Sequence, residues 1–486
     1  MNISKIILSN EIIYTNKHLD FEITGIVSDS RNAHIGCAFV AIKGENRDGN
    51  DYINDAISKG AIIIVTEEKN ANYEIPIIVV ENIRSTYSKM LSRYYNYPTE
   101  NMKVIAVTGT NGKTTTSHYL YNILKYANMK CGMISTIECL IMDKKEPVNG
   151  GGEVEDIYSA MTTPDPGNLY KLLYKMKKKG VEYLIIETSS HALKQRRLDG
   201  INVDIAIFTN LSPEHLDYHT TMEDYFITKS LLFEKAKEGI VNISDDYGKK
   251  LLSKYEHMHT VSFDSAGIGR IENIYFSEGT TKFIFNFRGE SIELETILQG
   301  EYNAMNATLA AYAAKLLNVD NDAIKDGVKS TLVSGRLEQV YKNVYIDYAH
   351  TPLATENVLI TLKKTLNGKK IIALFGCGGE RDKTKRAEIG KIVSKYSDVA
   401  IITSDNSRNE DLFDIIKDII VGINTSKPYF VIPDRKNAII YAIKHLVNDD
   451  SVLILLGKGH ENYQIDKTGK HHFDEKEIIK EGLLDV

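Results

Sequence analysis

The chain has 486 residues, a formal net charge of −6 and a pI near 6.2. This length suffices for two to four domains, each with a core of its own. The acidic balance argues against a bulk nucleic-acid binder. No run of eighteen apolar residues occurs, so we expect no membrane-spanning helix.

The first residues and the cysteines indicate a cellular compartment. The start, MNISKIILSNEIIY, has no uninterrupted apolar segment and no small-residue cleavage site, so we expect no signal peptide. Cys37, Cys131, Cys139 and Cys377 show no paired metal-ligand spacing. Scattered cysteines of this kind indicate reduced thiols, and we expect a cytoplasmic protein.

Residues 1–98 form the first predicted unit. The β-branched runs 39–42 and 61–65 are bounded by Gly and predict buried strands. Residues 51–59 between them have helical spacing, with Gly60 as the residue that ends the helix. A turn with Pro98 then predicts a linker.

Residues 103–117, KVIAVTGTNGKTTTS, predict a strand, a phosphate-binding loop and a helix. Backbone N–H groups and the helix N-terminus would face a bound anion. Lys113 would reach the outer phosphates, and the Thr114 hydroxyl would bind Mg²⁺. Val107 occupies the position where the general Walker A pattern has Gly, so a Gly-rich turn that binds nothing is the alternative.

The next stretch predicts a helix over 117–127, a strand over 131–141 and a helix over 167–179. The apolar run 181–186 predicts a strand that ends in Glu187. Because ligands bind at the carboxyl edge of parallel sheets, we interpret Glu187 as an Mg²⁺ ligand. The following Ser-Ser-His is no hydrolase site, since there is no G-x-S-x-G elbow and neighbours on an extended chain point apart.

A polar loop over 210–219 follows a predicted strand over 203–209. His215 in this loop is either a metal ligand, an orienting group or part of a plain polar loop; without cysteines it is no structural zinc site. A helix is predicted over 222–233 and carries Lys229. Next to acidic groups, a lysine is ordinarily an ion-pair partner.

The last third predicts β-hairpins over 261–296, an Ala-rich helix after residue 299 and a third α/β unit. Strands are predicted over 371–375, 399–403 and 452–456. The G-x-G-G at 376–379 is weak evidence for NAD, because no acidic residue is placed for a ribose.

The chain resembles the Mur ligase family, ATP-dependent amide-bond synthetases that add amino acids to a UDP-linked sugar acid. Collinear motifs carry the resemblance: TGTNGKTT, ETSSHAL, NLSPEHLDYH, GRLE, DYAHTP, GCGGERD and GKGHE. The last motifs resemble the members that add the third residue of the peptidoglycan stem to UDP-N-acetylmuramoyl-L-alanyl-D-glutamate. The resemblance implies an α/β fold with a UDP-substrate-binding domain (1–98), a central phosphate-loop ATPase domain (99–334) and a Rossmann-like amino-acid-binding domain (335–486).

The resemblance also implies a chemistry. ATP phosphorylates the γ-carboxylate of D-glutamate, and the amine of an incoming amino acid displaces phosphate. Two Mg²⁺ and Lys113 would neutralise the transferring phosphoryl group. The pattern Tyr225, Lys229, Leu232, Phe233 matches the family's helix whose lysine is carboxylated by CO₂, which requires a neutral amine. The implied catalytic residues are Lys113, Lys229 and His215, and the implied metal ligands are Thr114, Glu187, His215 and carboxylated Lys229.

Two further sets of binding residues are implied by the resemblance. The ATP-binding set is Gly109, Thr110, Asn111, Gly112, Lys113, Thr114, Thr115, Asn306, Arg336 and Asp347. The set for the UDP-sugar peptide is Ser30, Glu45, Asn46, Arg47, Thr162, Thr163, Ser189, Gln195 and Arg197.

The incoming amino acid is predicted from residues 405–408. Members that add meso-diaminopimelate have D-N-P-R there, whereas this chain has Asp-Asn-Ser-Arg. The arginine suits a distal carboxylate, so we expect meso-diaminopimelate, with L-lysine or another diamino acid as the alternative because Ser407 replaces Pro. The implied amino-acid-binding residues are Arg381, Asp405, Asn406, Ser407, Arg408, Gly457 and Glu461.

We expect a monomer that binds the UDP-dipeptide, ATP and a diamino acid, and no nucleic acid. Three alternatives remain open at this point. They are a related ligase such as MurF or folylpolyglutamate synthase, a paralogue in another pathway, and a non-catalytic nucleotide-binding regulator, which would not need Lys229.

Overall fold

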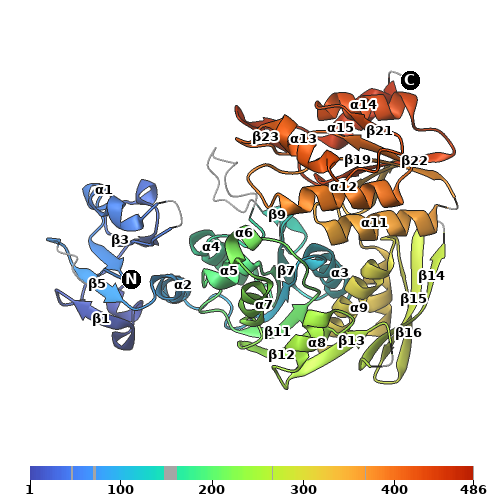
Figure 1. The fold of residues 1–486 in the computed structure, drawn as a ribbon. Helices are drawn as coiled ribbons and strands as arrows, with labels where there is room; N and C mark the ends of the chain where they lie inside the picture. Colours follow the sequence, from blue (N-terminus) through green and yellow to red (C-terminus); the bar gives the residue numbers. More distant parts are fainter. Residues whose placement is uncertain are drawn as a thin grey trace. The chain divides into compact units, whose positions relative to one another are not determined.

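The computed structural model describes residues 1–44, 47–68, 73–146, 161–264, 266–277, 279–366 and 368–484. Its helices and strands are drawn in Figure 1, and they group into two compact units. In the described part of the chain, no helix is long and apolar enough to cross a membrane. Unit 1 comprises Met1–Thr108, Met129–Ala206 and Thr228–Glu238, and unit 2 comprises Gly109–Asn128, Ile207–Ile227 and Gly239–Val486.

The N-terminal part of unit 1 is a five-stranded sheet of order β1-β5-β4-β3-β2. Strands β2 to β5 run parallel and β1 is antiparallel to β5. The predicted strands correspond to β3 and β4, whose side chains are all buried, as expected for parallel strands covered on both faces. The elements are η1 (Ile3–Lys5), η2 (Ser9–Glu11), β1 (Ile12–Thr15), β2 (Gly25–Val27), η3 (Ser30–Asn32), β3 (Cys37–Val40), η4 (Gly49–Tyr52), α1 (Ile53–Ser58), β4 (Ile63–Thr66), β5 (Ile77–Val80) and α2 (Ile83–Tyr94).

In the rest of unit 1, β6, β10 and β7 pair in parallel, and β8 and β9 continue antiparallel. The prediction of one strand over 131–141 was wrong in one respect: a turn divides this segment into two antiparallel strands, β7 and β8. Ser135 makes the turn, because its N–H and hydroxyl both bond the Glu138 backbone. The elements are β6 (Lys103–Thr108), β7 (Cys131–Ile134), β8 (Cys139–Ile141), β9 (Lys144–Glu146), α4 (Pro166–Lys179), β10 (Tyr183–Glu187), α5 (Ser190–Lys194) and β11 (Val203–Phe208).

The first part of unit 2 packs three helices, α3, α9 and α10, beside β13 to β16. Helices α3 and α10 approach closely at Gly327, where a Cβ atom would lie 2.5 Å from the Ile123 Cα. The predicted hairpins are β14, β15 and β16. The elements are α3 (Lys113–Tyr126), α6 (Leu216–His219), α7 (Met222–Ser230), β12 (Ala236–Asn242), α8 (Asp246–Leu252), β13 (Met258–Ser262), β14 (Gly269–Ser277), β15 (Thr280–Phe287), β16 (Glu290–Thr296), α9 (Glu301–Leu316) and α10 (Asn321–Lys329).

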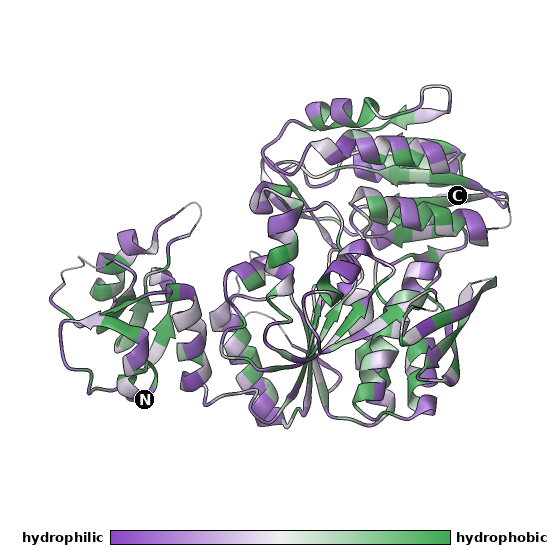
Figure 2. Ribbon diagram, turned by 60° about the horizontal axis from the view of Figure 1, so that its bottom comes forward, coloured by the Kyte–Doolittle hydropathy of each residue, from purple (hydrophilic) through white to green (hydrophobic). Residues whose placement is uncertain are grey.

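The C-terminal part of unit 2 is a six-stranded sheet of order β17-β18-β22-β19-β20-β21 between two layers of helices. Helices α11, α12 and α13 pack on one face and α14 and α15 on the other (Figure 1). Figure 2 shows the apolar strands of this sheet in green. The elements are β17 (Glu338–Tyr341), β18 (Val344–Asp347), α11 (Pro352–Thr365), β19 (Lys370–Phe375), α12 (Thr384–Tyr396), β20 (Val399–Ile402), α13 (Leu412–Ile420), β21 (Tyr429–Val431), α14 (Arg435–His445), β22 (Ser451–Leu456), β23 (Tyr463–Asp466), β24 (Gly469–His472) and α15 (Glu475–Leu484).

The parallel pairing of β18, β22, β19 and β20 brings four loops to one edge. These strands end at Asp347, Phe375, Ile402 and Leu456. The loops that follow carry the predicted amino-acid-binding residues, at the edge where open α/β sheets bind ligands.

Candidate functional site

The predicted phosphate loop lies between β6 and α3, as expected. Gly112 precedes α3 in a left-handed conformation (φ 85°) and no side chain caps the helix there, which leaves the start of α3 able to face an anion. Two glycines are required: a Cβ on Gly109 would lie 1.9 Å from the Thr209 Oγ1, and a Cβ on Gly112 would lie 2.4 Å from the Asn306 Oδ1.

The loop is held by the segment that follows β11. The Asn111 N–H donates to the Asn210 Oδ1 at 3.0 Å, and the Thr209 hydroxyl donates to the Asn111 carbonyl at 2.6 Å. The Thr110 hydroxyl accepts from the Ser212 N–H at 3.0 Å. The loop backbone is therefore fixed before any ligand arrives.

Lys113 and the two threonines after it begin α3. The Lys113 ammonium donates to the Gly109 and Thr110 carbonyls at 3.0 and 2.8 Å, so it lies over its own loop. Thr114 and Thr115 are buried in the first turn. A loop of this kind with a lysine above it fits a nucleotide phosphate.

Three predicted ATP residues belong to the same unit. Asn306 accepts from the Thr116 hydroxyl at 3.4 Å, next to the loop. The Arg336 guanidinium lies 4.6 Å from the centre of the Tyr348 ring. Buried Asp347 accepts the Leu337 and Ala349 N–H groups, and burial raises its pKa against the opposing effect of Arg336. Their contact with ATP stays a prediction.

The structure adds a pair that the sequence reasoning missed, Glu214 and His350. The His350 Nε2 lies 2.9 Å from the Glu214 Oε1, and the His350 Nδ1 donates to the Tyr348 carbonyl. Burial acts to raise the pKa of Glu214, but His215, His350 and Lys113 hold it well below its usual range. Glu214 belongs to the NLSPEHLDYH motif and His350 to the DYAHTP motif. The two residues are 136 positions apart, so no local sequence pattern predicts their contact.

His215 takes an unusual backbone conformation. It precedes α6 with φ 55°, in the left-handed region, and its ring lies 3.8 Å from the Glu214 carboxylate. Non-glycine residues in this region cost free energy and cluster at functional sites. This placement fits a metal ligand or an orienting group equally.

Glu187 lies at the carboxyl end of β10, in register with Val107 near the end of β6. It is fully buried. Its two oxygens accept from the Thr136 N–H at 3.0 Å and the Thr136 hydroxyl at 2.9 Å. These bonds orient the carboxylate, an oxygen ligand of the kind that Mg²⁺ takes.

Among the residues described, no group of three or more His, Cys, Asp or Glu side chains is arranged to hold a metal ion.

The predicted UDP-sugar residues of unit 1 gather around Glu187. The Thr163 hydroxyl donates to the Glu187 carbonyl, and the Ser189 N–H donates to the Thr163 hydroxyl. Arg197 donates to the Thr163 carbonyl and to the Gln195 Oε1. The Thr136 hydroxyl also bonds Thr162, at 3.2 Å.

One expectation about this region was wrong. Ser189, Ser190 and His191 do not lie on an extended chain, because Ser189 caps the short helix α5 that begins at Ser190. Ser30 begins η3 and Arg47 lies on a loop of the N-terminal sheet, whereas Glu45 and Asn46 lie outside the described residues.

Lys229 lies near the end of α7, which stops at Ser230 rather than at 233. Only 1% of Lys229 is exposed. A charged ammonium is costly to bury unless it is paired.

The loops at the edge of the C-terminal sheet bring the predicted amino-acid site together. The Asn406 amide donates to Glu461 at 2.9 Å, and the buried Lys458 ammonium lies 3.3 Å from the same carboxylate. Arg408 adopts φ 53° and donates to the Gly379 carbonyl at 2.7 Å. Burial first, and then the neighbouring Arg381, lower the pKa of Arg408.

The remaining predicted residues support these loops. Buried Asp405 has a pKa below its usual value, because Lys458 and Arg435 outweigh the opposing effect of burial. Gly457 has φ 111°, and a Cβ there would lie 2.8 Å from an Asp405 oxygen. A Cβ on Gly379 would lie 1.9 Å from the Ser407 carbonyl, so these two loops touch through their backbones.

Comparisons with known proteins agree with this architecture. Three family models match successive segments: the Mur ligase family, catalytic domain (22–97), the Mur ligase middle domain (107–314) and the Mur ligase, glutamate ligase domain (335–459). Relatives named UDP-N-acetylmuramoyl-L-alanyl-D-glutamate–2,6-diaminopimelate ligase match over nearly the full length. The one from Caldanaerobacter subterraneus is 38% identical over 96% of this chain and 95% of its own, and the one from Clostridium botulinum is 38% identical over 100% of both.

Solved structures agree as well. One named UDP-N-acetylmuramoyl-L-alanyl-D-glutamate–2,6-diaminopimelate ligase has a TM-score of 0.70 at 27% identity and covers 100% of this chain and 99% of its own. MurF from Thermotoga maritima in complex with ADP shares the fold, with a TM-score of 0.63 at 20% identity over 95% and 97% of the chains.

The fold and the loop between β6 and α3 define an α/β protein with a phosphate-binding loop. The chain belongs to the Mur ligase family.

The loop geometry predicts the effect of Gly112→Ala. A Cβ would meet Asn306 and would also be strained at φ 85°, so we expect ATP binding to weaken at least about tenfold, measured by calorimetry. Gly180→Ala is the control. Gly180 has φ 77°, and a Cβ added there would meet open space, so this substitution carries only the free-energy cost of holding alanine at a positive φ, about 1 kcal/mol. Equal ATP affinity in the two variants would contradict the loop assignment.

His460 predicts a pH response. Burial, with Arg336 and other cationic neighbours, lowers its pKa from 6.5 to about 3. The unfolded chain binds this proton below about pH 6.5 and the folded chain does not, so stability falls as pH drops from about 6.5 to 3.

We therefore expect the His460 ring to stay neutral between about pH 5 and 8 in an NMR titration. Exposed His472, whose pKa Glu477 raises, should titrate above 6.5 in the same experiment. A His460 midpoint near that of free histidine would contradict the burial argument.

Proposed function

We propose that this protein is an ATP-dependent ligase that adds meso-diaminopimelate to UDP-N-acetylmuramoyl-L-alanyl-D-glutamate in peptidoglycan precursor synthesis, with ADP and phosphate as products. The observation that carries the proposal is the near-full-length similarity, at about 38% identity, to relatives of that name. The phosphate loop and the paired loops of the C-terminal sheet supply matching binding sites.

The residues of the phosphate loop bind and orient ATP. Backbone N–H groups around Gly112 and the start of α3 hold the phosphates, and Lys113 moves from its own carbonyls to the outer phosphates. The D-glutamate carboxylate attacks the γ-phosphorus, ADP leaves, and an acyl phosphate forms. The amine of the amino acid then attacks the acyl carbon, and phosphate leaves from the tetrahedral intermediate.

Mg²⁺, with two ions expected, would neutralise the phosphoryl charge when bound. Thr114, Glu187, His215 and Lys229 as the carbamate would hold it. The Thr136 N–H and hydroxyl both donate to the Glu187 carboxylate and hold its position for such a role.

Carboxylation of Lys229 is part of this proposal. CO₂ adds to the neutral amine, the nitrogen loses one proton, and a carbamate anion results. The Lys229 side chain is only 1% exposed, and the carbamate would supply oxygens where a lysine would supply a positive charge.

The amino-acid preference rests on two arginines and one carboxylate. Arg408 and Arg381 provide adjoining positive charge for the distal carboxylate of meso-diaminopimelate. Glu461, which Asn406 orients, faces the distal ammonium. L-Lysine lacks that carboxylate and would leave the guanidinium groups without an anionic partner.

The proposal extends to organisation. The domains are 1–98 for the UDP-substrate, 99–334 for ATP and 335–486 for the amino acid. The partners are the UDP-dipeptide, ATP and the amino acid. The chain acts as a monomer in the cytoplasm, the compartment that holds nucleotide-linked precursors and ATP.

Phosphate release with the UDP-dipeptide, ATP and Mg²⁺ tests the substrate. We expect meso-diaminopimelate to give a kcat/KM at least about a hundredfold above that of L-lysine or ornithine, about 2.7 kcal/mol of discrimination. Arg408→Lys should lower this preference, and Lys417→Met, on the surface of α13, should not.

Preference for lysine would reject diaminopimelate but keep the reaction. Nucleotide binding without release of phosphate for any diamino acid would favour the non-catalytic regulator.

The carbamate is tested by ¹³C NMR of protein equilibrated with ¹³C-bicarbonate. A carbamate resonance should be present in the native protein and absent from Lys229→Arg, whose kcat should fall at least about a hundredfold. Lys237→Arg is the control, with an exposed lysine in the same unit. An unchanged spectrum in Lys229→Arg would reject the modification.

A further inference from the structure

Residues 195–200, the loop after α5, are held by three serines of α2. The Ser85 hydroxyl donates to the Asp199 Oδ2 at 2.6 Å, Ser88 donates to the Arg196 carbonyl at 2.8 Å, and Ser92 donates to the Gly200 carbonyl at 3.1 Å. Their spacing of three and four residues places all three hydroxyls on one face of α2. This face of α2 therefore holds the loop 195–200 through three hydrogen bonds.

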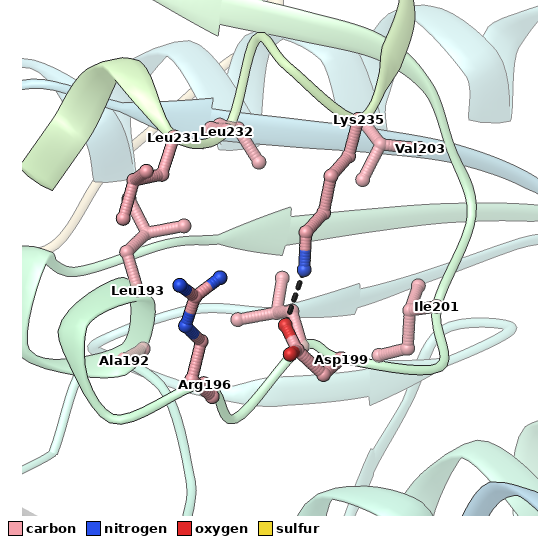
Figure 3. A pocket seen from close by; sticks show the side chains of 10 residues that line it. Ala192, Leu193, Arg196, Asp199, Ile201, Val203, Leu231, Leu232 and Lys235 are labelled. Carbon is pink, nitrogen blue, oxygen red and sulfur yellow. Dashed lines mark hydrogen bonds and ion pairs between the residues drawn. The ribbon is translucent and has the colours of Figure 1, made fainter. Parts of the chain in front are cut away.

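Asp199 connects the loop to two further elements. Its second carboxylate oxygen pairs with Lys235, in the segment after α7 (Figure 3). The Tyr170 hydroxyl of α4 donates to the Asp199 carbonyl at 2.6 Å. One residue thus contacts α2, α4 and the segment that follows Lys229 by six positions.

The surroundings strengthen this ion pair. The Asp199 side chain is 9% exposed and the Lys235 side chain 36%. Leu198, Ile201 and Leu232 form apolar walls of the pocket beside the pair. Asp199 is the better shielded partner, so removing Lys235 would leave a largely buried carboxylate without its ion-pair partner.

The loop backbone is strained at Arg196, a non-glycine residue in the left-handed region, whereas glycine at position 200 adopts its positive φ without strain. Arg196 has φ 57° and Gly200 has φ 96°, and a Cβ on Gly200 would lie 3.0 Å from the Ser92 Cβ and from the Tyr170 hydroxyl. Strained backbone of this kind persists only where the surrounding contacts over-determine it.

The far side of the same loop reaches the proposed UDP-sugar site. Arg197, between Arg196 and Asp199, donates to the Thr163 carbonyl, and the Thr163 hydroxyl donates to the Glu187 carbonyl. A shift at Asp199 would therefore move the Arg197 guanidinium.

We propose that Asp199, paired with Lys235 and Ser85, is a positioning residue that sets Arg197 for the UDP-sugar peptide and ties its loop to the segment following Lys229. The inference rests on the proposed function and deepens it. Asp199 acts through Arg197, so its loss weakens capture of the UDP-dipeptide more than that of ATP.

The test compares two lysines on one segment. Lys235→Met removes the ion-pair partner of Asp199. Lys237→Met removes an ion-pair partner of Asp204, and in the contacts described Lys237 touches neither α2 nor the loop 195–200. We expect Lys235→Met and Asp199→Asn to raise the KM for the UDP-dipeptide about tenfold and the KM for ATP less than about twofold. Lys237→Met should change neither.

Coupling gives a second readout. The double variant Asp199→Asn/Lys235→Met should resemble the single variants, because the two residues form one unit. Hydrogen exchange of amides 195–200 should rise in Lys235→Met and not in Lys237→Met, and this measurement does not depend on turnover.

Parallel increases of both KM values, or equal behaviour of the two lysine variants, would overturn the positioning role. If the wild-type protein formed no product, the proposed function would be rejected instead. Hydrogen exchange of amides 195–200 would then be the deciding measurement, and equal exchange in Lys235→Met and Lys237→Met would overturn the inference.

Discussion

The structure depends on one constraint: the chain must turn from β6 into α3 without side chains at Gly109 and Gly112. At both positions a Cβ would overlap a neighbouring polar group, the Thr209 hydroxyl and the Asn306 amide respectively. The hydrogen bonds from Asn210 and Thr209 can fix the loop only because the backbone comes so close. The N-terminus of α3, which no side chain caps, then gives the partial positive charge on which phosphate binding would depend.

Buried charge is organised around this loop and at the edge of the C-terminal sheet. Burial acts to raise the pKa of Glu214, but its interactions with His215, His350 and Lys113 hold that pKa well below its usual range. At the sheet edge, burial first and then the positive charge of Arg381 lower the pKa of Arg408, against the opposing effect of Asp405, Glu461 and Glu380. Under the proposed function, the two guanidinium groups would bind the distal carboxylate that lysine lacks.

The sequence predicted elements whose signal is local. The strand–loop–helix at 103–126, the carboxylate at the end of β10 and the apolar strands of the C-terminal sheet were confirmed, because β-branched runs and glycines act within a few residues. The hairpin at Ser135 and the short helix at Ser190 were missed, since single side-chain-to-backbone bonds decide them. Glu214 with His350, and Asp199 with Lys235, could not be predicted, because tertiary folding alone brings these residues together.

Isotope transfer tests the central claim, that the enzyme activates a carboxylate with the γ-phosphate. The UDP-dipeptide carrying ¹⁸O in the γ-carboxylate of D-glutamate is turned over with ATP and the amino acid, and the released phosphate is examined by mass spectrometry. Phosphoryl transfer to the carboxylate predicts one ¹⁸O in each phosphate, because the acyl phosphate breaks at the acyl carbon. Phosphate without ¹⁸O, formed at the same rate as the peptide bond, would contradict the account.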